Sequence, residues 1–322
     1  MSDSATGTED AGTEDESTEK NSDTEGNSDK GESSKGGKHS KHSKHNSTAA
    51  EKDSNDTKES ETTDTSETDT ESTSTSATIA EDGVIGTYNS DDAQITITQY
   101  TYEGTTVYVA DVTLSSAEYI KTAFAQGTYG KNVTETTSSM AEDNNAILAI
   151  NGDNYGSQES GYVIRNGIVY RDEAGDSDVL CIYADGSMEI IDSEEYTAQE
   201  LVDNGVWQAF SFGPALIEDG TVSVDEDDEV GKAKASNPRT AIGIIDDLNY
   251  IFVVSDGRTD ESEGLSLYQL AEFMESLGAD TAYNLDGGGS STMVFNGEVI
   301  NNPTTTGNTI KEREVNDIVY IG

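Results

Sequence analysis

Residues 284–293 hold the residue types best suited to bind an anion next to a carboxylate. They read Asn-Leu-Asp-Gly-Gly-Gly-Ser-Ser-Thr-Met, so Asp286 is followed by three glycines and two serines. Glycine loses more backbone entropy on folding than any other residue, so a run of three indicates that bare backbone is needed here. Successive amide N–H groups in such a loop form a concave anion site, and hydroxyls are further donors. A simple glycine-rich turn between two strands is the alternative.

The segments around this loop predict where its carboxylate lies. Residues 250–255 and 281–285 have the composition of strands. Between them, Leu and Met recur every three or four residues over 265–277, which predicts a helix that packs one side on the core. This strand-helix-strand order brings the loops that begin at Asp256 and Asp286 to one edge of a sheet, where ligands bind in open sheets.

Other segments also follow the patterns of strands and short helices. Residues 94–102 and 106–114 alternate or cluster β-branched and aromatic residues, which predicts a hairpin. Residues 117–125 and 134–144 are predicted to be short helices. Residues 197–204 begin with Thr and carry Glu three positions later, the signature of a capping box at a helix start.

Composition divides the chain near residue 80. Residues 1–80 contain no aromatic residue and are rich in Ser, Thr, Asp and Glu, which predicts a long disordered acidic tether. Residues 81–322 are predicted to form one α+β domain with a mixed, mostly antiparallel β-sheet and a few packed helices. This domain holds 44 acidic and 10 basic residues, so nucleic acid is not expected as a partner.

The positions of histidine and cysteine exclude several catalytic classes. All three histidines, His39, His42 and His45, lie in the predicted tether. Ser-His-Asp and Cys-His catalysis and histidine-ligated zinc are therefore excluded from residues 81–322. Cys181 is the only cysteine, so it forms no intrachain disulfide, and its apolar neighbours predict a buried side chain on a strand and not a nucleophile.

The sequence contains no apolar run long enough to span a bilayer, so no membrane insertion by this chain is expected. A Ser/Thr/Asp/Glu-rich tether ahead of a single domain is typical of cell-surface proteins. We therefore expect an extracellular or cell-surface location, with an anchor that is absent from this chain.

Motifs in the second half of the chain, taken in order, resemble the phosphodiester glycosidase domain. The resemblance is close over residues 237–321 and looser at 151–155 and 212–216. The motifs are Asn-Pro-Arg-Thr-Ala-Ile-Gly at 237–243, Ser-Asp-Gly-Arg-Thr at 255–259, the helix at 265–277, the loop at 284–293, and Arg-Glu-Val at 313–315. The family includes the mannose-6-phosphate uncovering enzyme of animals and bacterial exopolysaccharide-associated proteins.

The resemblance implies hydrolysis of a sugar-1-phosphodiester between the anomeric carbon and the phosphate oxygen, which releases a free sugar. It implies as substrate a glycan or glycolipid phosphodiester of a bacterial surface. Because a phosphomonoester is a good leaving group, an oxocarbenium-like transition state needs carboxylates and anion donors more than histidine. Two other functions stay open: a non-catalytic polysaccharide-binding or exopolysaccharide-assembly module, and a metal-dependent phosphodiesterase.

The site residues follow from the motifs. Asp286 is predicted to be the catalytic carboxylate, as nucleophile or as base, with Asp256 as its partner. Asp153 is the alternative partner, and both of these acids can instead belong to simple turns. A divalent cation, Ca²⁺ or Mg²⁺, is left open as a ligand of the three acids. The predicted phosphate- and substrate-binding residues are Asn151, Arg239, Thr240, Gly257, Arg258, Gly287, Gly288, Gly289, Ser290, Ser291 and Arg313.

Overall fold

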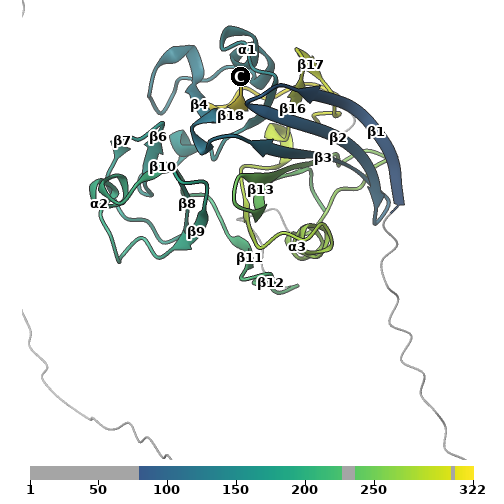
Figure 1. Cartoon of the computed structure of the whole chain (residues 1–322). Helices are drawn as coiled ribbons and strands as arrows, with labels where there is room; N and C mark the ends of the chain where they lie inside the picture. Colours follow the sequence, from purple (N-terminus) through teal and green to yellow (C-terminus); the bar gives the residue numbers. More distant parts are fainter. Residues whose placement is uncertain (1–79, 227–235, 306–308) are drawn as a thin grey trace, which may run out of the picture. The chain divides into compact units, whose positions relative to one another are not determined.

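The computed structural model describes residues 80–226, 236–305 and 309–322 (Figure 1). The predicted tether therefore lies almost entirely outside the described residues. The described residues form three antiparallel sheets with a few short helices, so the predicted α+β class with mostly antiparallel strands is confirmed. Among these residues, no helix has the length and apolar character that a membrane span requires.

The largest sheet has eight strands in the spatial order β1-β2-β3-β14-β13-β15-β11-β12. The predicted hairpin is confirmed as β2 and β3, which pair in a continuous antiparallel register. The strands of this sheet are β1 (Ala80–Asn89), β2 (Ala93–Tyr102), β3 (Thr105–Leu114), β11 (Ala215–Glu218), β12 (Thr221–Val222), β13 (Arg239–Asp246), β14 (Asn249–Ser255) and β15 (Thr281–Asn284).

Two sheets of five strands complete the fold, in the orders β7-β6-β10-β8-β9 and β17-β16-β5-β18-β4. The first contains β6 (Val163–Arg165), β7 (Ile168–Arg171), β8 (Val179–Tyr183), β9 (Met188–Ile191) and β10 (Val206–Phe210). The second contains β4 (Ile120–Phe124), β5 (Leu148–Asn151), β16 (Met293–Phe295), β17 (Glu298–Val299) and β18 (Asp317–Ile321). Cys181 is fully buried in β8, as predicted, and burial raises the pKa of its thiol to about 12.

The helices are short and agree with most of the predictions. The predicted capping box at the start of α2 is confirmed, because Thr197 and Glu200 exchange hydrogen bonds. The prediction of a helix over 117–125 is wrong in its larger part, because buried and half-buried residues alternate there and form β4. The α-helices are α1 (Thr137–Asp143), α2 (Ala198–Asp203) and α3 (Leu267–Ser276), and the 3₁₀ helices are Ala117–Tyr119, Ala125–Gly127, Tyr155–Ser157 and Gly288–Ser290.

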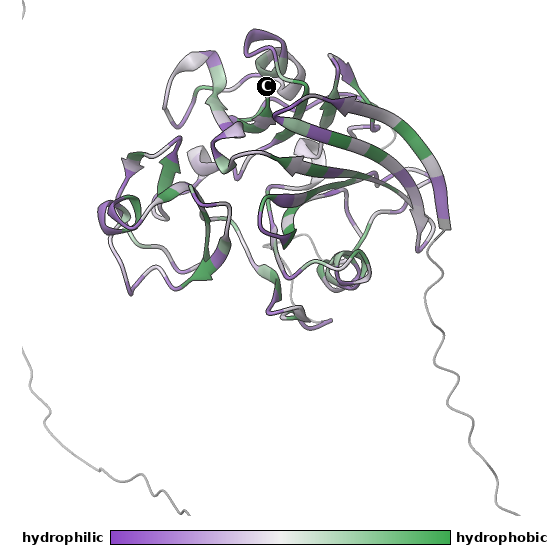
Figure 2. Cartoon of the chain, viewed as in Figure 1, coloured by the Kyte–Doolittle hydropathy of each residue, from purple (hydrophilic) through white to green (hydrophobic). Residues whose placement is uncertain are grey.

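Apolar side chains cover both faces of the eight-stranded sheet. Neighbouring residues alternate between the faces, so Ile242 packs in one buried cluster and Ala241 in the other, which also contains the apolar side of α3. Figure 2 shows hydrophobic and hydrophilic segments alternating along β2 and β3. The two cores hold the central strands rigidly, so the loops at the strand ends start from fixed positions.

Candidate active site

Three central strands meet at the edge of the sheet that forms the site. Arg239, the first residue of β13, pairs with Ser255, the last residue of β14. On the other side of β13, Ala241 pairs with Asn284 at the end of β15. Because β14 and β15 both run antiparallel to β13, they are parallel to each other, and the loops that follow them lie at one edge, as predicted.

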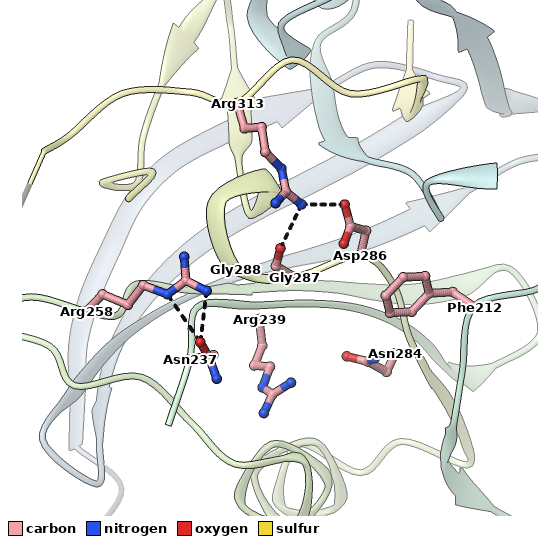
Figure 3. A pocket seen from close by; sticks show the side chains of 9 residues that line it. All are labelled: Phe212, Asn237, Arg239, Arg258, Asn284, Asp286, Gly287, Gly288 and Arg313. Atoms are coloured by element: carbon pink, nitrogen blue, oxygen red, sulfur yellow. Dashed lines mark hydrogen bonds and ion pairs between the residues drawn. The ribbon is translucent and has the colours of Figure 1, made fainter. Parts of the chain in front are cut away.

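A cavity of about 200 Å³ opens at this edge (Figure 3). Three arginines and one carboxylate are among its lining residues, so cationic groups outnumber acids. This balance is opposite to that of the domain as a whole. The lining residues are Phe212, Asn237, Arg239, Arg258, Asn284, Asp286, Gly287, Gly288 and Arg313.

Asp286 is buried, with 8% of its surface exposed, and one of its oxygens is fully engaged. Its Oδ2 accepts hydrogen bonds from Ser290 Oγ at 2.5 Å and from Arg313 Nη2 at 2.8 Å. Arg313 Nε also donates to Ser290 Oγ at 2.9 Å. The other oxygen of Asp286, Oδ1, has no hydrogen bond to a described residue. This oxygen is therefore the one available for chemistry in the cavity.

Burial raises the pKa of the Asp286 carboxyl above its ordinary value. The positive charge of Arg313 and the Ser290 hydrogen bond oppose this rise, because both favour the ionised form. The negative charge of Asp153 adds to the rise. An acid whose pKa is raised towards neutrality is a better general base than an ordinary surface carboxylate.

Arg258 is fixed at the opposite side of the cavity by protein acceptors. Its Nε and Nη2 donate to Asn237 Oδ1 at 3.2 and 3.0 Å. Its Nη1 donates to the carbonyls of Thr304 and Thr305 at 3.3 and 3.0 Å. Burial and the nearby charge of Arg313 lower the pKa of Arg258. Two cations held close together in this way are stabilised when an anion binds between them.

Arg239 supplies the third guanidinium group from the start of β13. It is 3% exposed, and its Nε donates to the carbonyl of Leu265 at 2.8 Å. The same carbonyl accepts a hydrogen bond from the backbone N–H of Asn237 at 3.2 Å. The strand therefore positions this arginine before any ligand binds.

Close backbone packing explains the glycines of the loop. A Cβ on Gly257 would lie 2.6 Å from Pro238 N, and one on Gly289 would lie 2.9 Å from Thr305 Cα. Gly288 has a φ of +63°, and a Cβ there would lie 2.8 Å from Arg258 Nη2. Side chains at these positions would push the loop away from its neighbours.

Three of the five amides in the loop 287–291 donate hydrogen bonds within the protein. The N–H of Gly288 donates to the Pro238 carbonyl at 2.7 Å, and the N–H of Ser290 donates to the Gly287 carbonyl at 3.3 Å. The N–H of Ser291 likewise donates to Gly288 at 3.2 Å. Because these three amides already have acceptors, they are not available to an anion, whereas three arginine side chains line the cavity.

Asp256 does not line the cavity. It is 2% exposed, and its two oxygens accept hydrogen bonds from Asn302 N at 2.7 Å and Asn302 Nδ2 at 3.0 Å. Burial raises the pKa of Asp256, and the Asn302 hydrogen bonds oppose the rise. The geometry does not support the predicted partner role, because both oxygens anchor the segment at Asn302.

Asp153 likewise does not line the cavity and belongs to a buried ion-pair group. Arg165 Nη2 lies 2.7 Å from Asp153 Oδ1 and 2.9 Å from Asp317 Oδ2, and all three side chains are 1% exposed. Asp153 Oδ2 accepts a hydrogen bond from Ser211 N at 3.0 Å. This arrangement supports a structural role for Asp153, in place of the predicted catalytic one.

Asn151 and Thr240 do not line the cavity either, and they support the residues that do. Asn151 Nδ2 donates to the carbonyl of Asp286 at 2.6 Å, and its Oδ1 accepts from Thr240 Oγ1 at 2.8 Å. Both side chains are fully buried. They therefore hold the backbone of Asp286, whereas direct contact with substrate was predicted. Ser291 is also fully buried and does not line the cavity.

The acids of the described residues are not grouped in threes. Within residues 80–226, 236–305 and 309–322, no group of three or more His, Cys, Asp or Glu side chains is arranged to hold a metal ion. Asp153 and Asp256 each use both oxygens in protein contacts, so they do not converge with Asp286 on one point.

Three lining residues were not among the predicted site residues: Phe212, Asn237 and Asn284. All three stand inside motifs that carried the family resemblance, at 212–216, 237–243 and 284–293. Their membership of these motifs was the signal that could have identified them. The prediction favoured charged residues, because the chemistry of a charged side chain is easier to assign.

The model of the phosphodiester glycosidase family matches residues 144–322, which include every residue of this cavity. The chain belongs to the phosphodiester glycosidase family. A Bacillus subtilis protein, the SPbeta prophage-derived uncharacterized protein YomE, is 31% identical over 180 residues, which cover 54% of this chain and 28% of that protein. Human N-acetylglucosamine-1-phosphodiester alpha-N-acetylglucosaminidase is 32% identical over 120 residues, covering 36% of this chain and 23% of that protein. The matched regions thus span less than a third of these relatives.

One solved structure has a similar fold. The catalytic domain of the zebrafish N-acetylglucosamine-1-phosphodiester alpha-N-acetylglucosaminidase, auto-inhibited by its pro-peptide, superposes with a TM-score of 0.58 at 22% identity. The superposition covers 76% of this chain and 88% of the zebrafish chain. The two proteins therefore share a fold.

Proposed function

We propose that this chain hydrolyses a sugar-1-phosphodiester by breaking the bond between the anomeric carbon and the phosphate oxygen. The observation that carries the proposal is the convergence of Arg239, Arg258 and Arg313 with Asp286 around one cavity. Guanidinium groups bind phosphate oxygens through paired hydrogen bonds, and the domain has few other cations to spare. Family membership supports the same reaction type.

The roles follow from the charges. The phosphodiester anion lies against the arginines, and the anomeric carbon lies within reach of Asp286 Oδ1. As the bond to oxygen breaks, the arginines stabilise the negative charge that develops on the phosphate. The phosphomonoester leaves without a protonating acid, which agrees with a cavity lined by one carboxylate. Asp286 either attacks the anomeric carbon or takes a proton from the attacking water.

We further propose a bacterial surface glycan or glycolipid as the source of the substrate, outside the cell. The composition of the predicted tether and the match to a Bacillus subtilis protein support this location. A polar cavity of this size accepts one sugar and its phosphate, with the rest of the polymer or lipid remaining outside.

The test is hydrolysis of a panel of sugar-1-phosphodiesters by the full chain, in parallel with Asp286→Asn and with Asp91→Asn as an exposed control. We expect free sugar from the parent and from the control, and none from Asp286→Asn. In ¹⁸O-labelled water, the label enters the sugar if the carbon–oxygen bond breaks and the phosphate if the phosphorus–oxygen bond breaks. Label in the phosphate would contradict this proposal and favour the metal-dependent phosphodiesterase. Binding of a polysaccharide without release of sugar would contradict it and favour the non-catalytic binding module.

A further inference from the structure

Asn284 carries a buried oxygen that the protein leaves unused. The residue is 1% exposed and lines the cavity. Among the described residues, none donates a hydrogen bond to its Oδ1. A buried acceptor without a donor is costly, and such atoms in native proteins mark places where a ligand completes the hydrogen bonding.

The protein fixes the direction of this oxygen. Asn284 Nδ2 donates to the carbonyl of Gly213 at 2.8 Å, so a flipped amide would place two oxygens against each other. The backbone N–H of Asn284 donates to the carbonyl of Pro214 at 3.2 Å. Figure 3 shows the amide oxygen pointing into the cavity, towards the side on which Arg239 lies.

Phe212 stands beside Asn284 in the same wall. Its backbone N–H donates to Tyr283 Oη at 2.9 Å, and Tyr283 Oη donates to the carbonyl of Asp178 at 2.6 Å. The segment that carries Phe212 is therefore tied to β15, like Asn284. An aromatic ring next to a fixed acceptor suits a sugar ring, which has apolar C–H groups and hydroxyl donors.

The cavity is thus divided by chemistry. Arg258 and Arg313 lie on one side, and Phe212 and Asn284 form an uncharged wall on the other, with Arg239 on the side towards which the Asn284 oxygen points (Figure 3). Asp286 lies between them in the wall (Figure 3). This order matches a sugar-1-phosphodiester laid with its phosphate on the arginines and its ring on Phe212.

We infer that Asn284 Oδ1 accepts a hydrogen bond from one O–H or N–H donor on the sugar ring and so selects the sugar. The inference rests on the proposed function and deepens it, because it names the residue that distinguishes one ring substituent from another. A site built to bind a donor rejects analogues that lack it, since the acceptor is then left buried and unpaired.

The experiment combines Asn284→Ala with analogues of the best substrate, each lacking one ring donor. In the parent, we expect one analogue to lose about tenfold or more in kcat/KM, and the others to lose less. In Asn284→Ala, the same analogue should lose less than about twofold relative to the complete sugar. Phe212→Leu is the matched control, because it changes the same wall but removes no acceptor, and the selectivity for that donor should persist.

The outcomes separate the inference from the function. Release of sugar with equal losses for every analogue in the parent would overturn the role of Asn284 and leave the hydrolase proposal standing. This result needs only the parent, so it holds even if Asn284→Ala does not fold. Persistence of the selectivity in a folded Asn284→Ala would also overturn the role. No release from any phosphodiester would overturn both.

Discussion

Arg313 Nη2 lies 2.8 Å from Asp286 Oδ2, and this ion pair joins the segment before β18 to the loop after β15. The Arg313 side chain is 41% exposed, whereas that of Asp286 is 11% exposed. A solvent-accessible cation thus opposes the rise in pKa that burial causes in this acid. The same guanidinium also faces the cavity, so it serves both the carboxylate and any anion that binds there.

Replacing Arg313 by Gln is expected to move the acid limb of the pH profile of kcat/KM to higher pH. The arginine lowers the pKa of Asp286, so its loss raises that pKa further. The ionised carboxylate then forms only at higher pH. The measurement is the pH profile of the parent, Arg313→Gln and Arg258→Gln. The Arg258 variant should weaken substrate binding without moving the limb, and an equal shift in both variants would contradict the prediction.

Asp286→Asn and Asp256→Asn should separate catalysis from stability. Asp286→Asn removes the reactive oxygen and is expected to lower kcat by about a thousandfold or more, with little change in melting temperature. Asp256→Asn turns an amide N–H towards the Asn302 donors and should cost about 1–3 kcal/mol of stability. Thermal melts and kinetics on both variants are the measurements. A folded Asp256→Asn as inactive as Asp286→Asn would restore Asp256 as the catalytic partner.

Gly288→Ala and Gly278→Ala form a matched pair. Both glycines have positive φ values, +63° and +86°, so alanine should cost about 1 kcal/mol at either position. At Gly278, a Cβ meets nothing within 4 Å, whereas at Gly288 it lies 2.8 Å from Arg258 Nη2. Only Gly288→Ala should therefore raise KM for a phosphodiester. Equal KM values in the two variants would show that Arg258 does not need its present position.

Asp317 is expected to make stability fall as pH rises. Burial raises the pKa of this carboxyl from 3.8 to about 7, although Arg165 opposes the rise. Between these values the folded state binds more protons than the unfolded state, so the contribution to stability is present below about pH 4 and is lost as pH approaches 7. Each pKa unit corresponds to about 1.4 kcal/mol.

Denaturant titrations of the parent, Asp317→Asn and Asp91→Asn at several pH values would measure this effect. The asparagine resembles the protonated acid, so Asp317→Asn should lose less stability than the parent between pH 4 and 7. Asp91 is exposed, and its variant should keep the slope of the parent. Parallel slopes for all three proteins would rule out the titration of Asp317 as the cause.

Treatment with EDTA is expected to leave the rate of sugar release unchanged. The reason is geometric: within the described residues, the acids that were candidates for a cation site make separate protein contacts. The measurement is activity before and after EDTA, with Mg²⁺ or Ca²⁺ added back. Loss with EDTA and recovery with either ion would favour the metal-dependent phosphodiesterase.

Local patterns in the sequence were sufficient for much of the fold. The spacing of apolar residues located α3, and the alternation over 94–114 located the hairpin of β2 and β3. The segment 117–125 was misassigned because its strand forms through pairing with β18, which is almost 200 residues away in the chain. Pairing with a distant strand overrode a weak local preference for helix.

The sequence by itself determined the loop of Asp286, the family motifs and the arginines that supply the positive charge, because residue type and short spacing define these. Only the tertiary structure decided which acids face the cavity. Asp256 is held by Asn302, which is 46 residues away in the chain, and Asp153 is held by Arg165 and Ser211, which are 12 and 58 residues away. The direction and the charge of a side chain depend on partners that folding brings together. A short motif does not include these partners, so it cannot predict either property.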